Sequence, residues 1–378
     1  MTLLLLVFIT CAKLEVIPTG TSADVPVDKG IYHSDPTRSD AFCEFKTIEN
    51  VANCWNQQLI VAEDCHYNLL FTRYGNGWTG SDATYSIPLP DGRIMWMFGD
   101  TFLGTVTAQR IRAGAPFIRN SLIIQDGDRM TTLFGGNKNQ PKAFVSPDDP
   151  GTWYWPLDAT IYNGKIQWLL GKLGSNGTGE AWDFAYRSFD LAILDPETFV
   201  IEYLETVIAS PDVSYGSCLL EDEDFTYIYG IWSSRRSKTV HIARVEGKNL
   251  QEPWSFYNGS SWIDRPSDHA IAKNVSDQFS VIKDGNLYYL ITHETIFGSR
   301  IFIAESISPT GPWTNRRILY CTPESGENIF TYNSFVHPEL ATSGELRISY
   351  NINSFNFADI FADADLYRPK FIRIDNWK

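Results

Sequence analysis

The sequence predicts an all-β fold: a five-bladed β-propeller with four-stranded antiparallel blades. Strand-like runs of alternating apolar and polar residues flank a tight-turn signal about every 60 residues. A second pair of strand-like runs follows each hairpin, and no amphipathic helix pattern separates the units. Five repeated units of four strands are typical of a propeller. The turns lie at Gly92, Gly164, Asp224, Gly285 and Gly344.

The propeller domain is expected to cover residues 41–378. The ring would close when the C-terminal run KFIRIDNW pairs with a strand that precedes Trp78. Residues 12–40 are rich in Pro, Asp, Ser and Thr and are interpreted as a leader or linker.

Residues 1–11 form a segment that resembles an export signal and a loose lipobox. The apolar run from Leu3 to Ile9 is too short to cross a bilayer as a helix. It fits the apolar core of a signal peptide, although the usual basic residues before it are missing. If the lipobox is used, Cys11 would carry a lipid that anchors the protein to a membrane. The segment predicts an exported protein that is secreted, periplasmic or lipid-anchored at the cell surface.

The composition limits the partners of the chain. A net charge of −14 argues against nucleic acid and anionic membranes as partners. An aromatic content of 14% suits both a β-rich core and surfaces that stack on sugars. The cysteines show no zinc spacing; one disulfide could form among Cys43, Cys54 and Cys65, and Cys218 and Cys321 are interpreted as buried thiols that act as small hydrophobic residues.

The first hairpin carries an aspartate at each open end. Alternation in the two strands and the Asp91-Gly92 turn predict a register in which paired residue numbers sum to 182. Asp82 and Asp100 would then face each other on neighbouring strands, with Cβ atoms roughly 4.5–5.5 Å apart. Facing like charges destabilise a sheet, so we expect this pair to have a functional reason.

Propeller geometry predicts which residues share one face. The first strand of each blade lines the central channel, so starts of first strands and ends of second strands meet at one end of it. The opposite end would receive the tight turns alone. The face is expected to collect Asp82, Asp100, Thr101, Asp158, Lys172, Tyr215, Ser217, Trp232, Asp277, Gln278, His293, Glu294, His337, Glu339 and Asn351.

Two carboxyl groups in different protonation states are what cleavage of a glycosidic bond requires. One protonates the leaving oxygen, and the other attacks the anomeric carbon or activates water. Repulsion between close carboxylates raises one pKa and leaves the other group ionised. Asp82 and Asp100 are therefore the predicted catalytic pair; the alternative is that each caps a turn.

Other polar and aromatic residues of this face are candidates for binding a substrate. Tryptophan rings stack on sugar C–H faces, although burial between blades is their usual role. The "LDAT" around Asp158 repeats the "SDAT" of the first blade but could be a turn. Only one of the adjacent residues His293 and Glu294 can face the channel, and a lone histidine is more often packing. The candidates are Trp78, Asp158, Trp232, Asp277, His293, Glu294, His337 and Asn351.

The sequence carries no motif for a cofactor or a metal. It has no G-x-S-x-G, no H-E-x-x-H, no P-loop and no dinucleotide fingerprint. A structural calcium at the axis stays open, because Asp277, Gln278 and Asn351 offer oxygen ligands.

Three segments carry a resemblance to a known family: "WTGSDATYSIPLPDGRIMWMFGDTF", "FSVIKDGNLYYLITHE" and "SFVHPELATSGELRISYN". Together, over roughly residues 65–378, they resemble a bacterial five-bladed propeller family of unknown function. That family is related to the endo-D-arabinanases of glycoside hydrolase family 183 and, more distantly, to families 43 and 62. The resemblance implies that the aspartates of "SDAT" and "GDT", Asp82 and Asp100, form the catalytic pair. It does not supply the substrate.

The sequence thus predicts an exported glycoside hydrolase that acts, without a cofactor, on a furanose-containing or related polysaccharide. The expected closeness of the two carboxyls favours a retaining mechanism. The alternative is a non-catalytic carbohydrate-binding propeller, such as a surface lipoprotein that captures glycans. A scaffold propeller is a third interpretation that nothing in the sequence favours.

Overall fold

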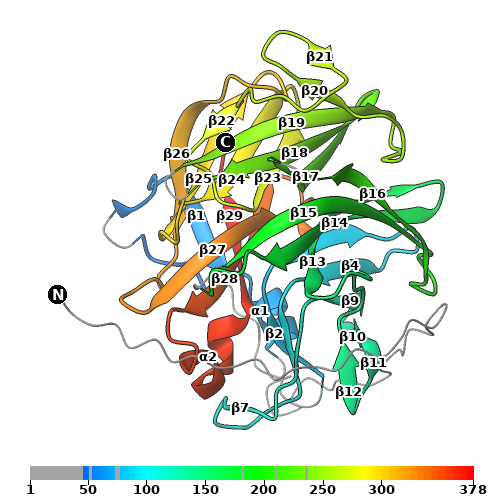
Figure 1. The fold of residues 1–378 in the computed structure, drawn as a ribbon. Coiled ribbons are helices and arrows are strands. Elements are labelled where there is room, and N and C mark those ends of the chain that lie inside the picture. Colours follow the sequence, from blue (N-terminus) through cyan, green and yellow to red (C-terminus); the bar gives the residue numbers. More distant parts are fainter. Residues whose placement is uncertain (1–45, 51–52, 73–76, 180–182, 210–211, 235–236) are drawn as a thin grey trace.

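The computed structural model describes residues 46–50, 53–72, 77–179, 183–209, 212–234 and 237–378, and this part of the chain is all-β (Figure 1). The signal-like segment 1–11 with Cys11, and the leader 12–40, lie outside the described residues. No helix in the described ranges is long and apolar enough to cross a membrane.

Five antiparallel sheets of four or more strands form the body of the molecule. In the first sheet, adjacent strands are β3 (Tyr85–Pro88), β4 (Ile94–Phe98), β9 (Ser121–Asp126) and β10 (Arg129–Leu133). The second contains β13 (Thr152–Tyr162), β14 (Lys165–Ser175), β15 (Phe184–Leu194) and β16 (Ile201–Ala209). The third contains β17 (Ser214–Asp222), β18 (Phe225–Ser233), β19 (Lys238–Glu246), β20 (Ser255–Tyr257), β21 (Trp262–Ile263) and β22 (Ala272–Lys273).

Two further sheets complete the body of the molecule, and short strands outside the five sheets form smaller pairs. The fourth sheet contains β23 (Phe279–Asp284), β24 (Leu287–His293), β25 (Arg300–Ser306) and β26 (Thr314–Cys321). The fifth contains β27 (Ile329–Val336), β28 (Glu345–Ser354), β29 (Pro369–Asp375) and β1 (Ile60–Glu63). The short strands are β2 (Trp78–Ser81), β5 (Thr101–Leu103), β6 (Thr105–Val106), β7 (Arg112–Ala113), β8 (Phe117–Ile118), β11 (Gly135–Asn137) and β12 (Gln140–Lys142).

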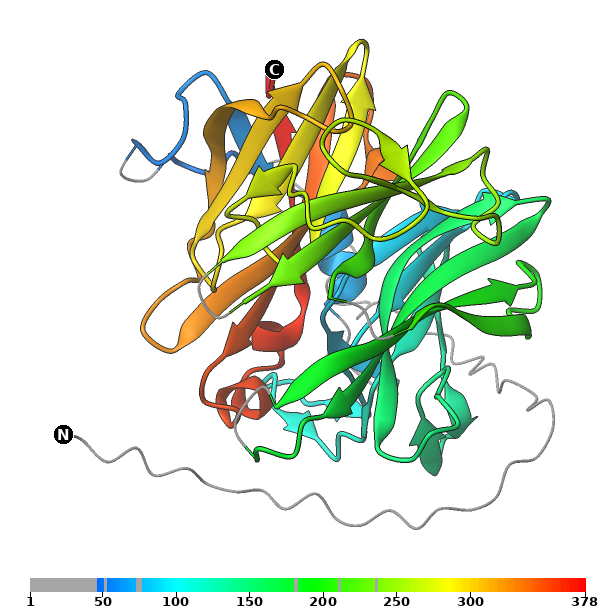
Figure 2. The same ribbon diagram turned by 45° about the horizontal axis from the view of Figure 1, so that its top comes forward.

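The first strands of the five sheets surround a central channel. Neighbouring first strands contact one another in the order β3, β13, β17, β23, β27. Residues from all five line one cavity of about 890 Å³. Between β3 and the end of β27, the Ser86 hydroxyl bonds the Nδ1 atom of His337 at 2.6 Å. Figures 1 and 2 show the sheets following one another around the molecule.

The two ends of the chain meet in the fifth sheet. Strand β1 pairs with β29 near the C-terminus, with Ile60 opposite Asp375 and Glu63 opposite Ile372. This confirms the predicted pairing of the C-terminal strand with a segment before Trp78. Closing the sheet this way covers the edge of β29, which would otherwise expose unpaired backbone groups.

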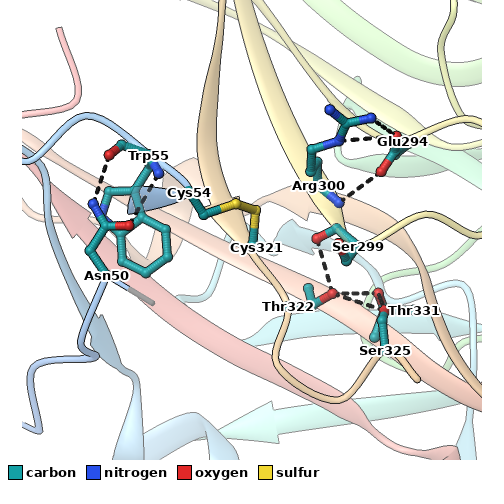
Figure 3. Close-up of a disulfide and its surroundings, with 10 residues drawn as sticks. All are labelled: Asn50, Cys54, Trp55, Glu294, Ser299, Arg300, Cys321, Thr322, Ser325 and Thr331. Atoms are coloured by element: carbon teal, nitrogen blue, oxygen red, sulfur yellow. Dashed lines mark hydrogen bonds and ion pairs between the residues drawn. A yellow bond between two sulfur atoms is a disulfide. The ribbon is translucent and has the colours of Figure 1, made fainter. Parts of the chain in front are cut away.

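A disulfide reinforces this closure. Cys54, just before β1, is bonded to Cys321 at the end of β26, with Cα atoms 6.2 Å apart (Figure 3). The expectation that Cys321 is a buried thiol is therefore wrong; sequence spacing could not show that the two lie side by side. Cys65 is also disulfide-bonded. Within the described ranges the free cysteine is Cys218, which is buried.

The core lies between successive sheets and contains most of the large aromatic side chains. Trp96 and Trp168, at equivalent places in the second strands β4 and β14, are fully buried. The sequence did not predict helix α1 (Cys65–Phe71), which is capped by Asp64 and buries Tyr67 and Phe71. Seven residues are too few to show a helical pattern. The remaining helical segments are α2 (Asp359–Ala362), η2 (Pro338–Leu340) and η3 (Ala364–Tyr367).

Candidate active site

The predicted register of the first hairpin is correct. Tyr85 faces Met97 and Ile87 faces Met95. On the other side of the aspartates, Ser81 of β2 faces Thr101 of β5. Each of these pairs sums to 182, so Asp82 and Asp100 lie between two segments that share one register. Both aspartates are half-buried.

The backbone around the two aspartates is held by short polar contacts. The Gly99 N–H donates to the Asp82 carbonyl oxygen at 3.0 Å. The Ser81 hydroxyl donates to the Asp100 carbonyl oxygen at 2.9 Å. Ala83 has φ 57°, a left-handed conformation that turns the chain between β2 and β3. A side chain on Gly99 would place its Cβ 2.7 Å from the Asp82 Oδ1, so a larger residue here would displace the Asp82 carboxyl.

Asp82 is surrounded by hydroxyl groups and by the second aspartate. The Tyr332 hydroxyl of β27 donates to its Oδ2 atom at 2.9 Å. Burial, and then the charge of Asp100, raise the pKa of Asp82 to about 7, while hydrogen bonds from Tyr332 and Tyr367 oppose that rise. At neutral pH a substantial share of this carboxyl therefore carries a proton.

Asp100 has a cation beside it. Arg119 Nη1 donates to Oδ2 at 3.1 Å, and Trp155 Nε1 donates to Oδ1 at 3.0 Å. Burial raises the pKa of Asp100, but the positive charge of Arg119 and both N–H donors act against that rise. The Arg119 guanidinium lies 4.5 Å from the ring centroid of Trp153 and 5.3 Å from that of Phe117, which fixes its position. The two carboxyls therefore sit in unequal surroundings.

Aromatic side chains extend from the pair towards two sides. From Asp100, the Trp155 ring contacts Phe184 at 4.8 Å between centroids, and Trp153 lies beyond. From Asp82, the Tyr332 ring contacts Phe330 at 5.4 Å, and Phe330 contacts Phe355, which is 60% exposed. These rows belong to the second and fifth sheets.

Two of the expected binding residues, one in the fourth sheet and one in the fifth, are buried. Asn351 of β28 donates through Nδ2 to the Thr84 hydroxyl at 3.1 Å. His293 bonds the Gly298 carbonyl at 2.8 Å and the hydroxyl of Thr331, the neighbour of Tyr332, at 3.1 Å. Burial lowers the pKa of His293 to about 4, so its ring is neutral at neutral pH. Neither side chain is available to a substrate in this structure, because both are fully buried.

Asp158 and His337 lie towards the other end of the channel. In the second sheet Ala159 pairs with Trp168, and in the first sheet Ser86 pairs with the equivalent Trp96. Ala159 is therefore at the same depth in the channel as Ser86. The "LDAT" motif is therefore three residues deeper in the channel than "SDAT", and the expected equivalence of Asp158 with Asp82 is wrong. His337 follows the end of β27 rather than its start, so it too is far along the channel from the pair.

Trp78 corrects another expectation. It is 1% exposed and packs against Phe71 and Phe98, so it cannot offer a ring to a sugar. Its burial follows from the short strand β2, which lies beneath the helix α1.

The other expected binding residues lie on the rim of the same end as the pair. Glu294 forms an ion pair with Arg300 (Figure 3), and Asp277 forms one with Lys238. Trp232, at the end of β18, is 40% exposed. Asp277, one of the ligands considered for a calcium, is paired with Lys238 instead. The described residues contain no group of three or more His, Cys, Asp or Glu side chains placed to hold a metal.

Sequence patterns did not identify Arg119, Tyr332 or Tyr367. Arg119 stands in "FIRNSL" just before β9, the strand that pairs with β4, and this adjacency is the one signal that could have placed it near Asp100. Tyr332 and Tyr367 follow the two aspartates by about 250 or more positions in the sequence. No short-range pattern can show that they lie beside them.

Comparisons with known proteins are consistent with a hydrolase fold. Residues 64–377 match the family described as "Domain of unknown function (DUF5005)". No curated protein sequence matches the chain. The crystal structure of a "putative hydrolase" from Bacteroides ovatus is 26% identical with a TM-score of 0.77, and the match covers 91% of this chain and 97% of that one.

Two glycoside hydrolases show weaker structural similarity. The GH43_1 enzyme from Xanthomonas citri complexed with xylose is 17% identical with a TM-score of 0.44, covering 80% of this chain and 88% of that one. An α-L-arabinanase mutant from Cellvibrio cellulosa is 10% identical with a TM-score of 0.41, covering 78% and 91%.

Proposed function

The chain belongs to the DUF5005 family, and we propose that it is a glycoside hydrolase whose reaction is carried by Asp82 and Asp100. Its five sheets are then the blades of a five-bladed propeller, and residues 41–378 are its domain. The order of the first strands and their shared cavity support this assignment.

The observation that carries the proposal is the unequal pair of carboxyls. Asp82 has a pKa of about 7 because it is buried beside another carboxyl. Asp100 instead accepts hydrogen bonds from Arg119 and Trp155. Glycoside hydrolysis needs one carboxyl protonated and its partner ionised at the same pH. Two turn-capping aspartates would not need a cation on one and repulsion on the other.

These surroundings assign the roles. Asp82, which keeps its proton to about pH 7, is the general acid that protonates the leaving oxygen. Asp100, paired with Arg119, is the nucleophile or the base. Their facing places between paired strands favour the nucleophilic role and retention of anomeric configuration, because a retaining pair is roughly 5–5.5 Å apart. An NMR spectrum of the first product anomer distinguishes retention from inversion.

The substrate class follows from the aromatic rows beside the pair. Rings such as Trp155 and Phe355 can stack on sugar C–H faces on opposite sides of the two aspartates. This suits an extended saccharide, and the resemblance to furanosidase propellers suggests a furanose-containing or related polysaccharide.

Export is part of the proposal. The disulfide between Cys54 and Cys321 is typical of proteins that fold in an oxidising compartment. This agrees with a signal in residues 1–11, which would bring the enzyme to polysaccharides outside the cell, with a leader in 12–40 and a lipid on Cys11 as its anchor.

Release of reducing ends from a panel of arabinans, arabinoxylans and arabinogalactans tests the proposal. Wild-type protein should release ends from at least one polymer, and Asp100→Asn should lower the rate by roughly 10²–10⁴-fold with little change in Tm. Binding to a polymer without release of ends is what a non-catalytic carbohydrate-binding propeller predicts. Normal hydrolysis by the variant would show that the site is assigned wrongly.

A further inference from the structure

The third sheet differs from the others by an extension at its outer edge. Strand β21 pairs with β20, and β22 returns to pair with β19 beside Thr239 and Val240. The segment between β21 and β22 is tied to β19 at Ser267, whose carbonyl oxygen is bonded by the His241 ring at 3.2 Å. This segment therefore lies against β19 at the edge of the sheet.

Beside this segment lies a pocket of about 940 Å³, which we call the Trp232 pocket. Its apolar lining includes Trp232, Ile208 and Val213. Its rim is polar and exposed, with Asp212, Arg265 and Asp268 among the lining residues. Neither Asp82 nor Asp100 lines it, so it is separate from the site described above.

The pocket opens on the same end of the channel as the aspartate pair. Gly99 in the first sheet and Gly230 in the third occupy equivalent positions, because each follows the hydrophobic run of the second strand of its sheet. The residues after these glycines therefore lie at the same end of the channel. Trp232 follows Gly230 by two residues, as Thr101 follows Gly99. A polymer that reached the pair could therefore extend across this rim to the pocket.

The chemistry of the lining indicates a carbohydrate. Trp232 is 40% exposed and lines this pocket, so its ring is open to a ligand that enters the pocket. A ring face beside carboxylate and guanidinium groups matches a sugar, which has apolar C–H faces and hydroxyls at its edges. The charges on the rim have both signs, which does not favour a strongly charged ligand.

We propose that the Trp232 pocket is a second carbohydrate-binding site, which holds the polysaccharide away from the cleavage point. This inference rests on the proposed function for the identity of the polymer. A pocket of this kind raises the local concentration of polymer at the aspartate pair through a second point of attachment.

Binding to soluble polysaccharides by the full chain tests the inference. In an Asp100→Asn background, which keeps the polymer intact, affinity electrophoresis with arabinan, arabinoxylan and arabinogalactan measures retention. Trp232→Ala should weaken the apparent Kd roughly tenfold. Trp232→Phe, which keeps a ring, should restore most of the affinity. The control is Tyr203→Ala, which removes a 47% exposed ring near the start of β16, at the other end of that strand from Ile208.

Equal retention of the Trp232→Ala variant and its parent would overturn the inference, as would a parent that no polymer retains. Reducing-end release by the wild-type chain, measured in parallel, separates the two proposals. Retention that depends on Trp232 in a chain that releases no ends supports the pocket and overturns the hydrolase. Release of ends by the wild-type chain, together with retention that does not change in Trp232→Ala, supports the hydrolase and overturns the pocket.

Discussion

Each end of the central channel contains a half-buried carboxyl whose pKa is raised to about 7 chiefly by removal from water, Asp82 at one end and Asp158 towards the other. Their partners differ. Asp158 accepts the N–H of Ala159 at 2.9 Å and the N–H of Leu219, on the neighbouring sheet, at 2.7 Å. Asp82 faces a second carboxyl instead. A raised pKa thus accompanies both a carboxyl that links two strands and the proposed catalytic pair, and the hydrogen-bond and charge partners distinguish them.

The largest expected difference between the two ends of the channel is the effect of an aspartate-to-asparagine substitution on activity and on stability. Asp82→Asn should lower hydrolysis by roughly 10²–10⁴-fold, because it removes the proton donor. Asp158→Asn should lower stability instead, by about 1–3 kcal/mol, because an amide cannot accept from both N–H groups through two oxygens. Reducing-end assays and urea unfolding measure the two effects. Similar activity losses in both variants would contradict the division between the ends.

The same variants differ in their pH dependence of stability. A folded-state pKa of about 7, above the unfolded value, means that each aspartate stabilises the fold in its protonated form. That contribution is complete below about pH 4 and is lost as the pH rises through 7. The wild-type Tm should therefore fall between pH 5 and pH 8, and Asp82→Asn should reduce that fall.

A smaller effect is expected from two glycines of the first hairpin. In Gly99→Ala the new Cβ would lie 2.7 Å from the Asp82 Oδ1 and displace the carboxyl, which should cost roughly 100-fold in kcat. Gly92, in the turn at the other end, has φ 87°, and a Cβ added there would meet no atom within 4 Å. Gly92→Ala should thus cost about 1 kcal/mol of stability and leave kcat unchanged. A kcat loss in Gly92→Ala equal to that in Gly99→Ala would show general damage to the hairpin.

The smallest expected effect concerns the cation that distinguishes Asp100. Arg119→Met removes the charge at 3.1 Å and should raise the pKa of Asp100. We expect the acidic limb of the kcat/KM profile to move to higher pH, with roughly a tenfold loss at pH 5. Arg119→Lys, which keeps the charge, should retain the wild-type profile more closely. An unmoved acidic limb in the Met variant would show that Arg119 does not set the state of Asp100.

The parts of this structure that the sequence could predict are those fixed by local patterns. Alternation and the Asp91-Gly92 turn determine which residue faces Asp100, so the pair was found. The similarity of "SDAT" and "LDAT" misplaced Asp158, because motif similarity ignores the bulge between Pro156 and Ala159 that sets the register. His337 was expected near the start of the first strand of the fifth sheet. It lies at the end of β27 instead, because the link from β27 to β28 is lengthened by the turn η2. Tyr332 reaches Asp82 through closure of the ring, which short-range patterns do not encode.

The pH dependence of kcat/KM on a cleaved polysaccharide tests the unequal pair most directly. Asp82 must keep its proton to act, so kcat/KM should fall as the pH rises through about 7, and an acidic limb should report Asp100 at lower pH. A profile that stays level from pH 6 to pH 9 would contradict the assignment of Asp82 as the acid.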